Sequence, residues 1–486
     1  MQRLRSFTRA FITLALFSTV SDAWPQQQLW ERLVGPDPFR TEGNVSPAPY
    51  KPWEPTAPLP PVPAPVTAQE PSTQAPLTLA ELTEFALRNN PRARQAWFAA
   101  RAAAAGVGIE QADYLPQVSG LLTAQRVRPV SATSGVASPW QNRYGPSVSL
   151  SYVLLDFARA DQVAAAEYRL LAANLNQNRV LQDVVFQVEQ AYFRLLGLDL
   201  LVRVNELTLT NLRTSLDAAN RRRESGLATM ADVYRAETQV AQADLNLSRS
   251  RGELEKARGQ LASTVGLPVN NTLQVRTLSE APKVTELTAT LNELLERARS
   301  TRPDLVAAEA QARAARASAQ AASKAALPTV ELAGTAGRTF FTDERVPASN
   351  YAIGLNVRIP IFTGFRDRYA YRLAEAQAEQ AIATRDTLYR QTELDVWQAY
   401  YDVQTAATGI GTTDSQVKSA EQTAQATLAR YQAGFGSILD LITAQQDEAN
   451  ARVQRIQSYL DWYTALARLE FSSGYSDLLA STGGRK

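Results

Sequence analysis

Two aspartates occupy matching places in the chain and are the residues best suited to a chemical role. They end the segments GLATMAD and GFGSILD, so Asp232 and Asp440 each stand six residues after a glycine and three after a hydroxyl side chain. The chain contains no histidine and no cysteine, which excludes histidine-assisted nucleophilic catalysis, thiolate metal sites and disulfides. The remaining carboxylates, lysines, tyrosines and serines form no compact constellation. We therefore expect neither an enzyme nor a bound metal or cofactor.

Each aspartate follows a turn that separates two long helical patterns. Gly226 and Gly434 are suited to end a helix in the left-handed conformation, and Thr229 and Ser437 can cap the helix that follows. In both corners the hydroxyl and the aspartate have the spacing of a capping box, and a carboxylate in the first turn also suits the helix dipole. Capping alone accounts for the two aspartates, and a role in attracting cations is the alternative.

The first residues have the character of an export signal. Residues 1–23 combine three arginines, an apolar stretch and a small-residue cleavage site, which favours a cleavable signal peptide over a buried N-terminal helix. Without cysteine the mature protein is not a lipoprotein. No later segment approaches the ~18 apolar residues that a membrane-spanning helix requires. The net charge of +2 indicates no basic surface for nucleic acid.

An internal duplication organises the rest of the chain. Three pairs of residues are separated by the same number of positions: Gly226 and Gly434, Asp232 and Asp440, and Gly266 and Gly474. We expect a first structural repeat at 77–265, a connection at 266–285, a second repeat at 286–474 and a tail at 475–486. Residues 24–76 precede them as a periplasmic linker, because their many prolines favour an extended chain.

Each repeat contains a segment with the alternation of a β-hairpin. We expect hairpins at 116–155 and 328–362, because apolar and polar residues alternate most strictly along 147–154 and 352–359, with Leu154 on the apolar side. Strands of this length with aromatic residues at their ends are typical of outer-membrane barrels. The alternative is a pair of soluble hairpins with one face in water. Closure in a membrane needs at least about eight strands, so several subunits must combine theirs.

A long helical run follows each hairpin. From Phe157 to about Ala219 the chain has no proline and only Gly197 as an interruption, which as one helix would extend roughly 90 Å. Two overlapping apolar stripes run along it and predict a neighbouring helix on each side. An ordinary buried bundle is the alternative to a ring of helices that continues a hollow barrel of strands.

The chain resembles the TolC-type outer-membrane factors, the exit ducts of tripartite efflux pumps and type I secretion systems. The resemblance extends from Leu77 to Gly474 and depends on the duplicated order of helix, hairpin, long helix, glycine turn and helix, with local matches such as NNP at 89–91 and YLP at 114–116. It implies a mostly α-helical fold with a transmembrane β-barrel portion: a trimeric α-barrel tunnel continuous with a 12-stranded outer-membrane barrel, four strands per subunit. The implied partners are a periplasmic adaptor protein, an inner-membrane transporter and outer-membrane lipid.

The resemblance assigns the two corners to the periplasmic tip of the tunnel, where the tube narrows. The turns that dock the adaptor would comprise Gly226, Leu227, Thr229, Gly434, Phe435 and Ser437. By the same resemblance Asp440 faces the axis, where three copies would form a ring of carboxylates that selects cations. Asp232 and Thr443 would also belong to this constriction.

The resemblance also implies a latch at the tip. Tyr431 is expected to bond to Asp232, while Gly436 occupies the position where the family has a latch arginine, so closure should depend on fewer ionic links. We interpret the three arginines at 221–223 as a solvated helix end rather than a docking patch.

Two other classes of function are the alternatives to a passive outer-membrane duct for small molecules or polypeptides. A periplasmic coiled-coil adaptor or stalk would have one helical hairpin beside a lipoyl-like β domain, whereas this sequence predicts two helical hairpins and strands of membrane length. A soluble carboxylate enzyme would need paired acids that face a pocket, whereas the acidic residues here follow solvated helix faces.

Overall fold

The computed structural model describes residues 45–46, 48–52, 76–128, 135, 137, 139–269, 273–276, 289–341 and 347–474. The expected signal peptide at 1–23 and the tail at 475–486 lie outside these residues, as do most of the segments 24–76 and 266–285.

The two halves of the described chain contain the same elements in the same order. The first half forms α3 (Leu79–Asn89), α4 (Pro91–Ala112), β1 (Gln117–Val127), β2 (Gln141–Leu155), α5 (Arg159–Glu224) and α6 (Met230–Thr264). The second half forms α7 (Leu291–Thr301), α8 (Pro303–Lys324), β3 (Thr329–Phe341), β4 (Ala348–Arg358), α9 (Arg366–Gln432) and α10 (Ile438–Ser473). Matching helices have nearly equal lengths, with 66 residues in α5 against 67 in α9, and 35 in α6 against 36 in α10. A duplicated sequence predicts this agreement.

The four strands form one antiparallel sheet in the order β1–β2–β3–β4. Apolar partners such as Leu332 and Leu355 stand opposite each other on one face. On the other face Ser119 pairs with Ser149, and their hydroxyl oxygens are 2.7 Å apart. One face of the sheet is therefore apolar and the other carries mainly polar or small side chains, as the alternation predicts.

The pairing of β2 with β3 contains one irregularity. The register shifts between Val153 and Leu155, so Leu155 rather than Leu154 stands opposite Val330. The strict alternation expected through Leu154 is therefore wrong for the last residues of β2. A bulge inserts one residue into a strand, and its position depends on the neighbouring strand rather than on the local pattern.

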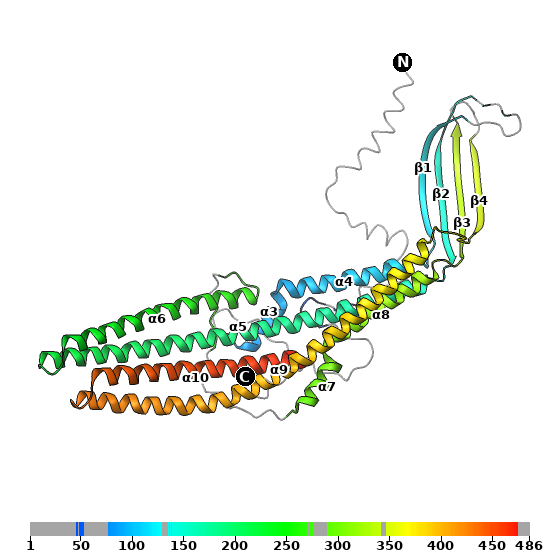
Figure 1. The fold of residues 1–486 in the computed structure, drawn as a ribbon. Helices are drawn as coiled ribbons and strands as arrows, with labels where there is room; N and C mark the ends of the chain where they lie inside the picture. Colours follow the sequence, from blue (N-terminus) through cyan, green and yellow to red (C-terminus); the bar gives the residue numbers. More distant parts are fainter. Residues whose placement is uncertain are drawn as a thin grey trace, which may run out of the picture.

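The long helices form two hairpins that pack side by side. α5 packs along α6, α9 packs along α10, and α5 also packs on α10, which gives the order α6–α5–α10–α9 (Figure 1). Closer to the sheet the order is α4–α5–α8–α9. The core between these helices contains the fully buried side chains of Phe193 and Trp462. The ring of Phe193 stacks on that of Tyr463 at 4.7 Å between centroids.

Helix α5 continues without a break through Gly197. A Cβ at this position would lie 2.1 Å from Cδ1 of Leu460 in α10, so glycine permits the close approach of the two hairpins. The one glycine in the proline-free run that predicts α5 is thus a packing contact.

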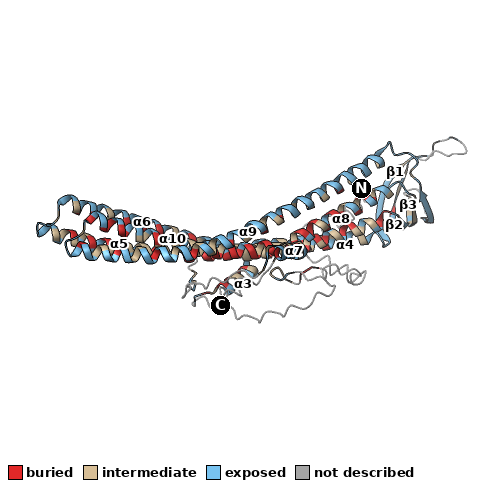
Figure 2. Cartoon of the chain, turned by 60° about the horizontal axis from the view of Figure 1, so that its bottom comes forward, coloured by how far each residue is buried: buried red, intermediate tan, exposed pale blue. Residues whose placement is uncertain are grey.

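The molecule is elongated, with the sheet at one end and the two helical corners at the other (Figure 1). In the part of the chain that the structure describes, each layer has two open flanks. β1 and β4 flank the sheet, α4 and α9 flank the helices near it, and α6 and α9 flank the helices near the corners. Figure 2 shows that the part of α9 nearest the sheet is largely exposed. None of the helices described above has a stretch apolar enough, over sufficient length, to span a membrane.

Part of the segment 24–76 differs from the linker that its prolines predict. Residues 45–46 and 48–52 lie against α4 and α5, where Val45 joins a small apolar cluster. Nε1 of Trp97 donates to the carbonyl of Ser46 at 2.6 Å, and Nε2 of Gln177 donates to the carbonyl of Lys51 at 3.0 Å. This stretch therefore supplies acceptors to side chains of the helices, which buried polar groups require.

Candidate functional site

The two corners end their long helices in the same way. The amides of Gly226 and Leu227 donate to carbonyls of the last turn of α5 at 2.9 and 2.8 Å, and those of Gly434 and Phe435 donate to carbonyls of the last turn of α9 at 3.1 and 2.9 Å. Gly226 and Gly434 have φ angles of +72° and +91°, a left-handed conformation that residues with side chains disfavour. Each long helix therefore ends in a Schellman motif at its glycine.

The corners differ in how the next helix begins. At α6 the Asp232 amide donates to Oγ1 of Thr229 at 3.3 Å, while the Asp232 carboxylate accepts from the amide and the hydroxyl of Thr229 at 3.0 and 2.8 Å. These bonds hold the pKa of Asp232 below its ordinary value of 3.8. At α10 the Asp440 amide donates to Oγ of Ser437 at 3.1 Å, but the Asp440 carboxylate accepts no hydrogen bond from any described residue. Capping thus engages Asp232 and leaves the carboxylate of Asp440 free.

Replacing Thr229 by alanine is expected to destabilise the first turn of α6 by about 1 kcal/mol, because the capping box is lost. Acid should weaken the same turn in the unmodified protein. Since the pKa of Asp232 is lowered, its stabilising effect is complete above pH 3.8 and is lost as the pH falls through the lowered value. Hydrogen exchange of the amides at the starts of α6 and α10 measures both effects. An equal loss of protection at α10, which lacks the carboxylate half of the box, would contradict this account.

Asp440 begins a polar stripe along one side of α10. Residues spaced alternately by three and four positions lie on one side of a helix that pairs as a coiled coil. The polar stripe of α10 consists of Asp440, Thr443, Asp447, Asn450, Gln454, Gln457, Asp461, Thr464 and Arg468. All are exposed except Thr464, which is partly buried. The stripe extends roughly 42 Å without an apolar residue, so this side of α10 is suited to face water.

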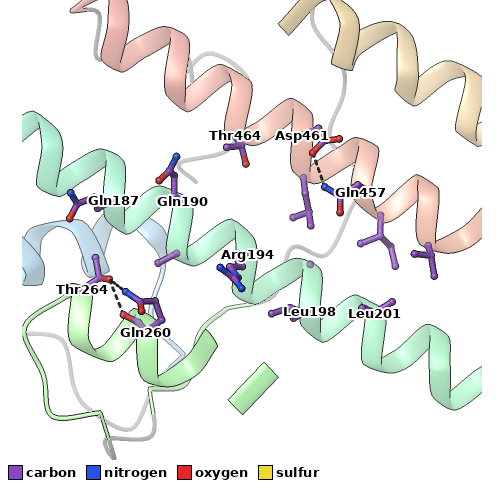
Figure 3. Close-up of a pocket in the computed structure, with 15 residues that line it drawn as sticks. Gln187, Gln190, Arg194, Leu198, Leu201, Gln260, Thr264, Gln457, Asp461 and Thr464 are labelled. Atoms are coloured by element: carbon purple, nitrogen blue, oxygen red, sulfur yellow. Dashed lines mark hydrogen bonds between the residues drawn. The ribbon is translucent and has the colours of Figure 1, made fainter. Parts of the chain in front are cut away.

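A groove of about 670 Å³ opens between α5, α6 and α10 on the side of the polar stripe (Figure 3). It shares Gln457, Asp461 and Thr464 with the stripe, and its other polar lining residues are Gln187, Gln190, Arg194, Gln260 and Thr264. Nε2 of Gln457 donates to Oδ1 of Asp461 at 2.7 Å. Asp461 is the single carboxylate of the lining, so the groove lacks the pair of acids that general acid–base catalysis by carboxylates would use. In the described part of the chain no cluster of three or more acidic, His or Cys side chains is suited to hold a metal ion.

The expected latch between Tyr431 and Asp232 is not formed within one chain. Tyr431 is 2% exposed, and its hydroxyl has no hydrogen-bond partner among the described residues. Burial raises the pKa of Tyr431, and the positive charge of Arg222 opposes this effect. The guanidinium of Arg222 lies over the Tyr431 ring, 4.7 Å from its centroid, and Nη1 donates to the Tyr431 carbonyl. The contact across the corners thus runs through the ring and the backbone of Tyr431.

Arg222 is the residue of this site that sequence reasoning missed. Its place among three arginines indicates a solvated helix end, and Arg221 and Arg223 are indeed exposed, with ion pairs to Asp217 and Glu224. Arg222 is partly buried and crosses to α9. Spacing along α5 does not reveal which of the three arginines faces the neighbouring hairpin.

The turns expected to dock an adaptor lie at the end of the molecule opposite the sheet (Figure 1). Leu227 and Phe435 are 69% and 82% exposed, although the residue after the glycine of a Schellman motif commonly packs on its own helix. At Gly436 a Cβ would lie 3.1 Å from the amide nitrogen of Tyr431. Two exposed apolar side chains therefore project from the corners, and a side chain at Gly436 would crowd the backbone at the end of α9.

Most of the chain is similar to known proteins. The family model described as outer membrane efflux protein matches residues 82–267 and 294–475, one match in each half. Protein CyaE of Bordetella pertussis is 28% identical over 388 residues, which cover 78% of this chain and 80% of that protein. Outer membrane protein OprJ of Pseudomonas aeruginosa is 26% identical over 422 residues, which cover 84% of this chain and 87% of that protein.

Solved structures show the same fold. The outer-membrane channel OprN matches with a TM-score of 0.74 at 23% identity, over 82% of this chain and 90% of that one. The outer membrane protein VceC from Vibrio cholerae matches with a TM-score of 0.72 at 22% identity, over 82% of this chain and 96% of that one. These matches confirm the fold class, and together with the family model they exclude the alternative of a periplasmic adaptor or stalk. The chain belongs to the outer membrane efflux protein family.

Proposed function

We propose that three copies of the chain close into one continuous duct, through which cargo moves passively. The observation that carries this proposal is the presence of two open flanks in every layer. Among the described residues β1 and β4 each leave one edge unpaired, and open edges do not occur in lipid. In a closed ring, β4 and α9 of one subunit would meet β1, α4 and α6 of the next. One rotation then closes the sheet and both helical layers together.

Exposed apolar side chains on the flanks support this closure. α9 carries Tyr369 and Trp397, and α4 carries Phe98 and Ile109, all of them exposed in the single chain. Large exposed apolar and aromatic side chains are typical of protein contacts rather than of surfaces that face water. We infer that they pack between neighbouring subunits.

The polar stripe of α10 would line the duct, with Asp440 at its narrow end. The exposed carboxylate that no cap engages supports this assignment. Three copies would form a ring of negative charge that attracts cations, and Thr443 would continue the wall one turn further along α10. Asp232 would lie near the constriction with its carboxylate held by Thr229.

The tip would dock a periplasmic adaptor that connects the duct to an inner-membrane transporter. Leu227 and Phe435 provide its apolar contacts, on turns shaped by Gly226, Thr229, Gly434 and Ser437. Relatives named for protease secretion (PrtF of Dickeya chrysanthemi, 23% identical) and for solvent efflux (SrpC of Pseudomonas putida, 25% identical) support an export duct whose cargo the transporter selects.

The same proposal covers the parts of the chain around the duct. Residues 1–23 would direct export and be cleaved, 24–76 would lead into the first repeat at 77–265, and 266–285 would connect it to the second repeat at 286–474. The mature chain would reside in the outer membrane with a long periplasmic extension and without a lipid anchor or a cofactor.

Trp397→Glu is expected to prevent ring closure, because it places a charge in an apolar contact between subunits. Wild-type protein purified in detergent should have the mass of a trimer and conduct ions in planar bilayers, whereas the variant should be monomeric and should not conduct ions. Gln454→Glu makes a similar charge change on the polar stripe of α10 and should remain trimeric. Trimeric Trp397→Glu would refute the assignment of this flank, and inserted wild-type protein without conductance would refute the duct itself.

A further inference from the structure

The contact of Arg222 joins the two repeats at their corners. Arg222 lies in the last turn of α5, whereas the Tyr431 carbonyl that it reaches lies in the last turn of α9. The same carbonyl accepts the amide of Gly434 at 3.1 Å as part of the motif that ends α9. The guanidinium of one repeat therefore completes the C-terminal cap of the long helix in the other repeat.

The chemistry of this contact favours an arginine. The C-terminal end of a helix carries partial negative charge, so a cation there is stabilising, and the face of a tyrosine ring attracts a guanidinium within about 6 Å of its centroid. Arg222 meets both conditions through one residue of α9. Arg221 and Arg223, with the same charge and nearly the same place in the sequence, pair with acids of their own helix.

An apolar cluster beneath Arg222 joins the same two corners. It contains Ala219 of α5, Ala236 of α6, Tyr431 of α9, and Ile438, Leu441 and Ile442 of α10. Ile438, Leu441 and Ile442 flank Asp440 along the first turns of α10. The position of Tyr431 thus influences the place of Asp440, and Arg222 holds Tyr431 against the first hairpin.

We propose that Arg222 is the positioning residue that holds the two tip corners of each subunit together and thereby keeps the duct narrow at Asp440. This inference depends on the proposed function, because it assumes that the corners form the narrow end of a duct. The hold acts through the ring and the carbonyl of Tyr431. The Tyr431 hydroxyl, which has no partner in the described chain, contributes nothing to it.

Single-channel recording of four variants tests the inference. Arg222→Ala should give a severalfold higher conductance or longer open periods than the wild type, because the second corner is free to move outward. Arg222→Lys should restore part of the wild-type behaviour, since an ammonium can still lie over the ring and donate to the carbonyl. Arg221→Ala should behave as wild type because that side chain does not cross to α9. Tyr431→Phe should also behave as wild type, because it retains the ring and the carbonyl.

The outcomes separate the inference from the function on which it depends. Conductance steps that are the same in the wild type and Arg222→Ala would overturn the inference but leave the proposed duct intact. An increase in conductance in Arg221→Ala or Tyr431→Phe equal to that in Arg222→Ala would have the same meaning. No steps from inserted wild-type protein would overturn the duct itself. Hydrogen exchange provides a second readout, with faster exchange expected at the starts of α6 and α10 in Arg222→Ala but not in Arg221→Ala. If Arg222→Ala does not assemble, Arg222→Gln serves in its place, because the glutamine amide can donate to the carbonyl without carrying a charge. The increase in conductance should then be smaller than that expected for Arg222→Ala but larger than that of Arg222→Lys.

Discussion

The Asp440→Asn channel is expected to lose most of its preference for cations in 0.1 M salt while it conducts as a trimer. Three carboxylates about 8 Å from a cation on the axis of a water-filled pore attract it with roughly 1.5 kcal/mol in total, which corresponds to about a tenfold change in cation occupancy. Asparagine has nearly the same shape and removes this attraction. The cap at the start of α10 should persist, because Ser437 accepts its hydrogen bond from the backbone amide of residue 440 and not from the side chain.

Salt and neighbouring acids provide the controls for Asp440→Asn. At 1 M salt the screening length falls to about 3 Å, so wild type and variant should become nearly indistinguishable. Asp232→Asn disrupts the capping box at α6 but should preserve most of the selectivity. Asp447→Asn removes an exposed carboxylate two turns further along the polar stripe of α10 and should have a smaller effect than Asp440→Asn. The reversal potential in a salt gradient measures the cation selectivity of the wild type and of the three variants. Selectivity unchanged in Asp440→Asn, or lost equally in Asp232→Asn, would reduce Asp440 to an ordinary residue of a helix start.

Local patterns in the sequence were sufficient to predict the four strands and the long helices of the fold. Alternation with a period of two places strands within 116–155 and 328–362, and all four strands lie there. The absence of proline predicts one helix past Gly197, and α5 continues to Glu224. Both signals come from residues close together in the chain, where burial on one side determines the pattern.

The features that the sequence did not predict depend on residues far apart in the chain. The bulge at the end of β2 depends on its pairing with β3, and the packing of residues 45–46 and 48–52 depends on donors in α4 and α5. The same holds for Arg222, whose partner is 209 positions away. Resemblance led to the expectation of a Tyr431–Asp232 bond, but in this chain Thr229 engages the aspartate.

One spacing in the sequence acquires its physical reason only in the structure. Gly266 and Gly474 follow the last helices of the two repeats, with φ angles of +87° and +70°. A Cβ on Gly266 would lie 2.9 Å from the carbonyl oxygen of Asn89, and one on Gly474 would lie 2.9 Å from Oγ1 of Thr301. Each repeat therefore ends where its last helix passes close to the end of its first short helix. The equal spacing of the two glycines marked this contact, which we call the joint of each repeat. The sequence does not reveal which side chains stabilise the joint.

In the second repeat, a buried arginine holds this joint, and its removal is expected to have the largest effect on stability. The Arg302 side chain is 3% exposed and donates to Oδ1 and Oδ2 of Asp304 at 3.0 and 2.5 Å and to the Ser472 carbonyl at 3.2 Å. Burial alone would raise the pKa of Asp304, but hydrogen bonding and positive charge from Arg302 and Arg179 outweigh it and hold the pKa below 3.8. Arg302→Ala should destabilise the protein by about 3–5 kcal/mol, because a largely buried carboxylate loses its main partner.

The guanidinium chloride concentration at the midpoint of unfolding, followed by helical circular dichroism at fixed protein concentration, measures this loss. Arg203→Ala is the control: the exposed Arg203 pairs with the partly exposed Asp199 one turn away, and its removal should cost less than about 1 kcal/mol. Similar midpoints for the two variants would show that the Arg302 cluster adds little to the joint.

The first repeat makes the same joint with an asparagine, which predicts how Arg302 can be replaced. Asn90 and Arg302 both precede the proline that begins the next helix, and Nδ2 of Asn90 donates to the Thr264 carbonyl at 3.0 Å as Arg302 does to that of Ser472. Asn90 also caps α4, a bond that arginine cannot make at α8 because it has no acceptor. Arg302→Asn should therefore regain the carbonyl bond and gain a cap, but leave Asp304 with Arg179 as its remaining cation. Its midpoint should lie between those of wild type and Arg302→Ala. A midpoint equal to that of Arg302→Ala would mean that the ion pair alone, and not the joint shared by both repeats, stabilises this part of the molecule.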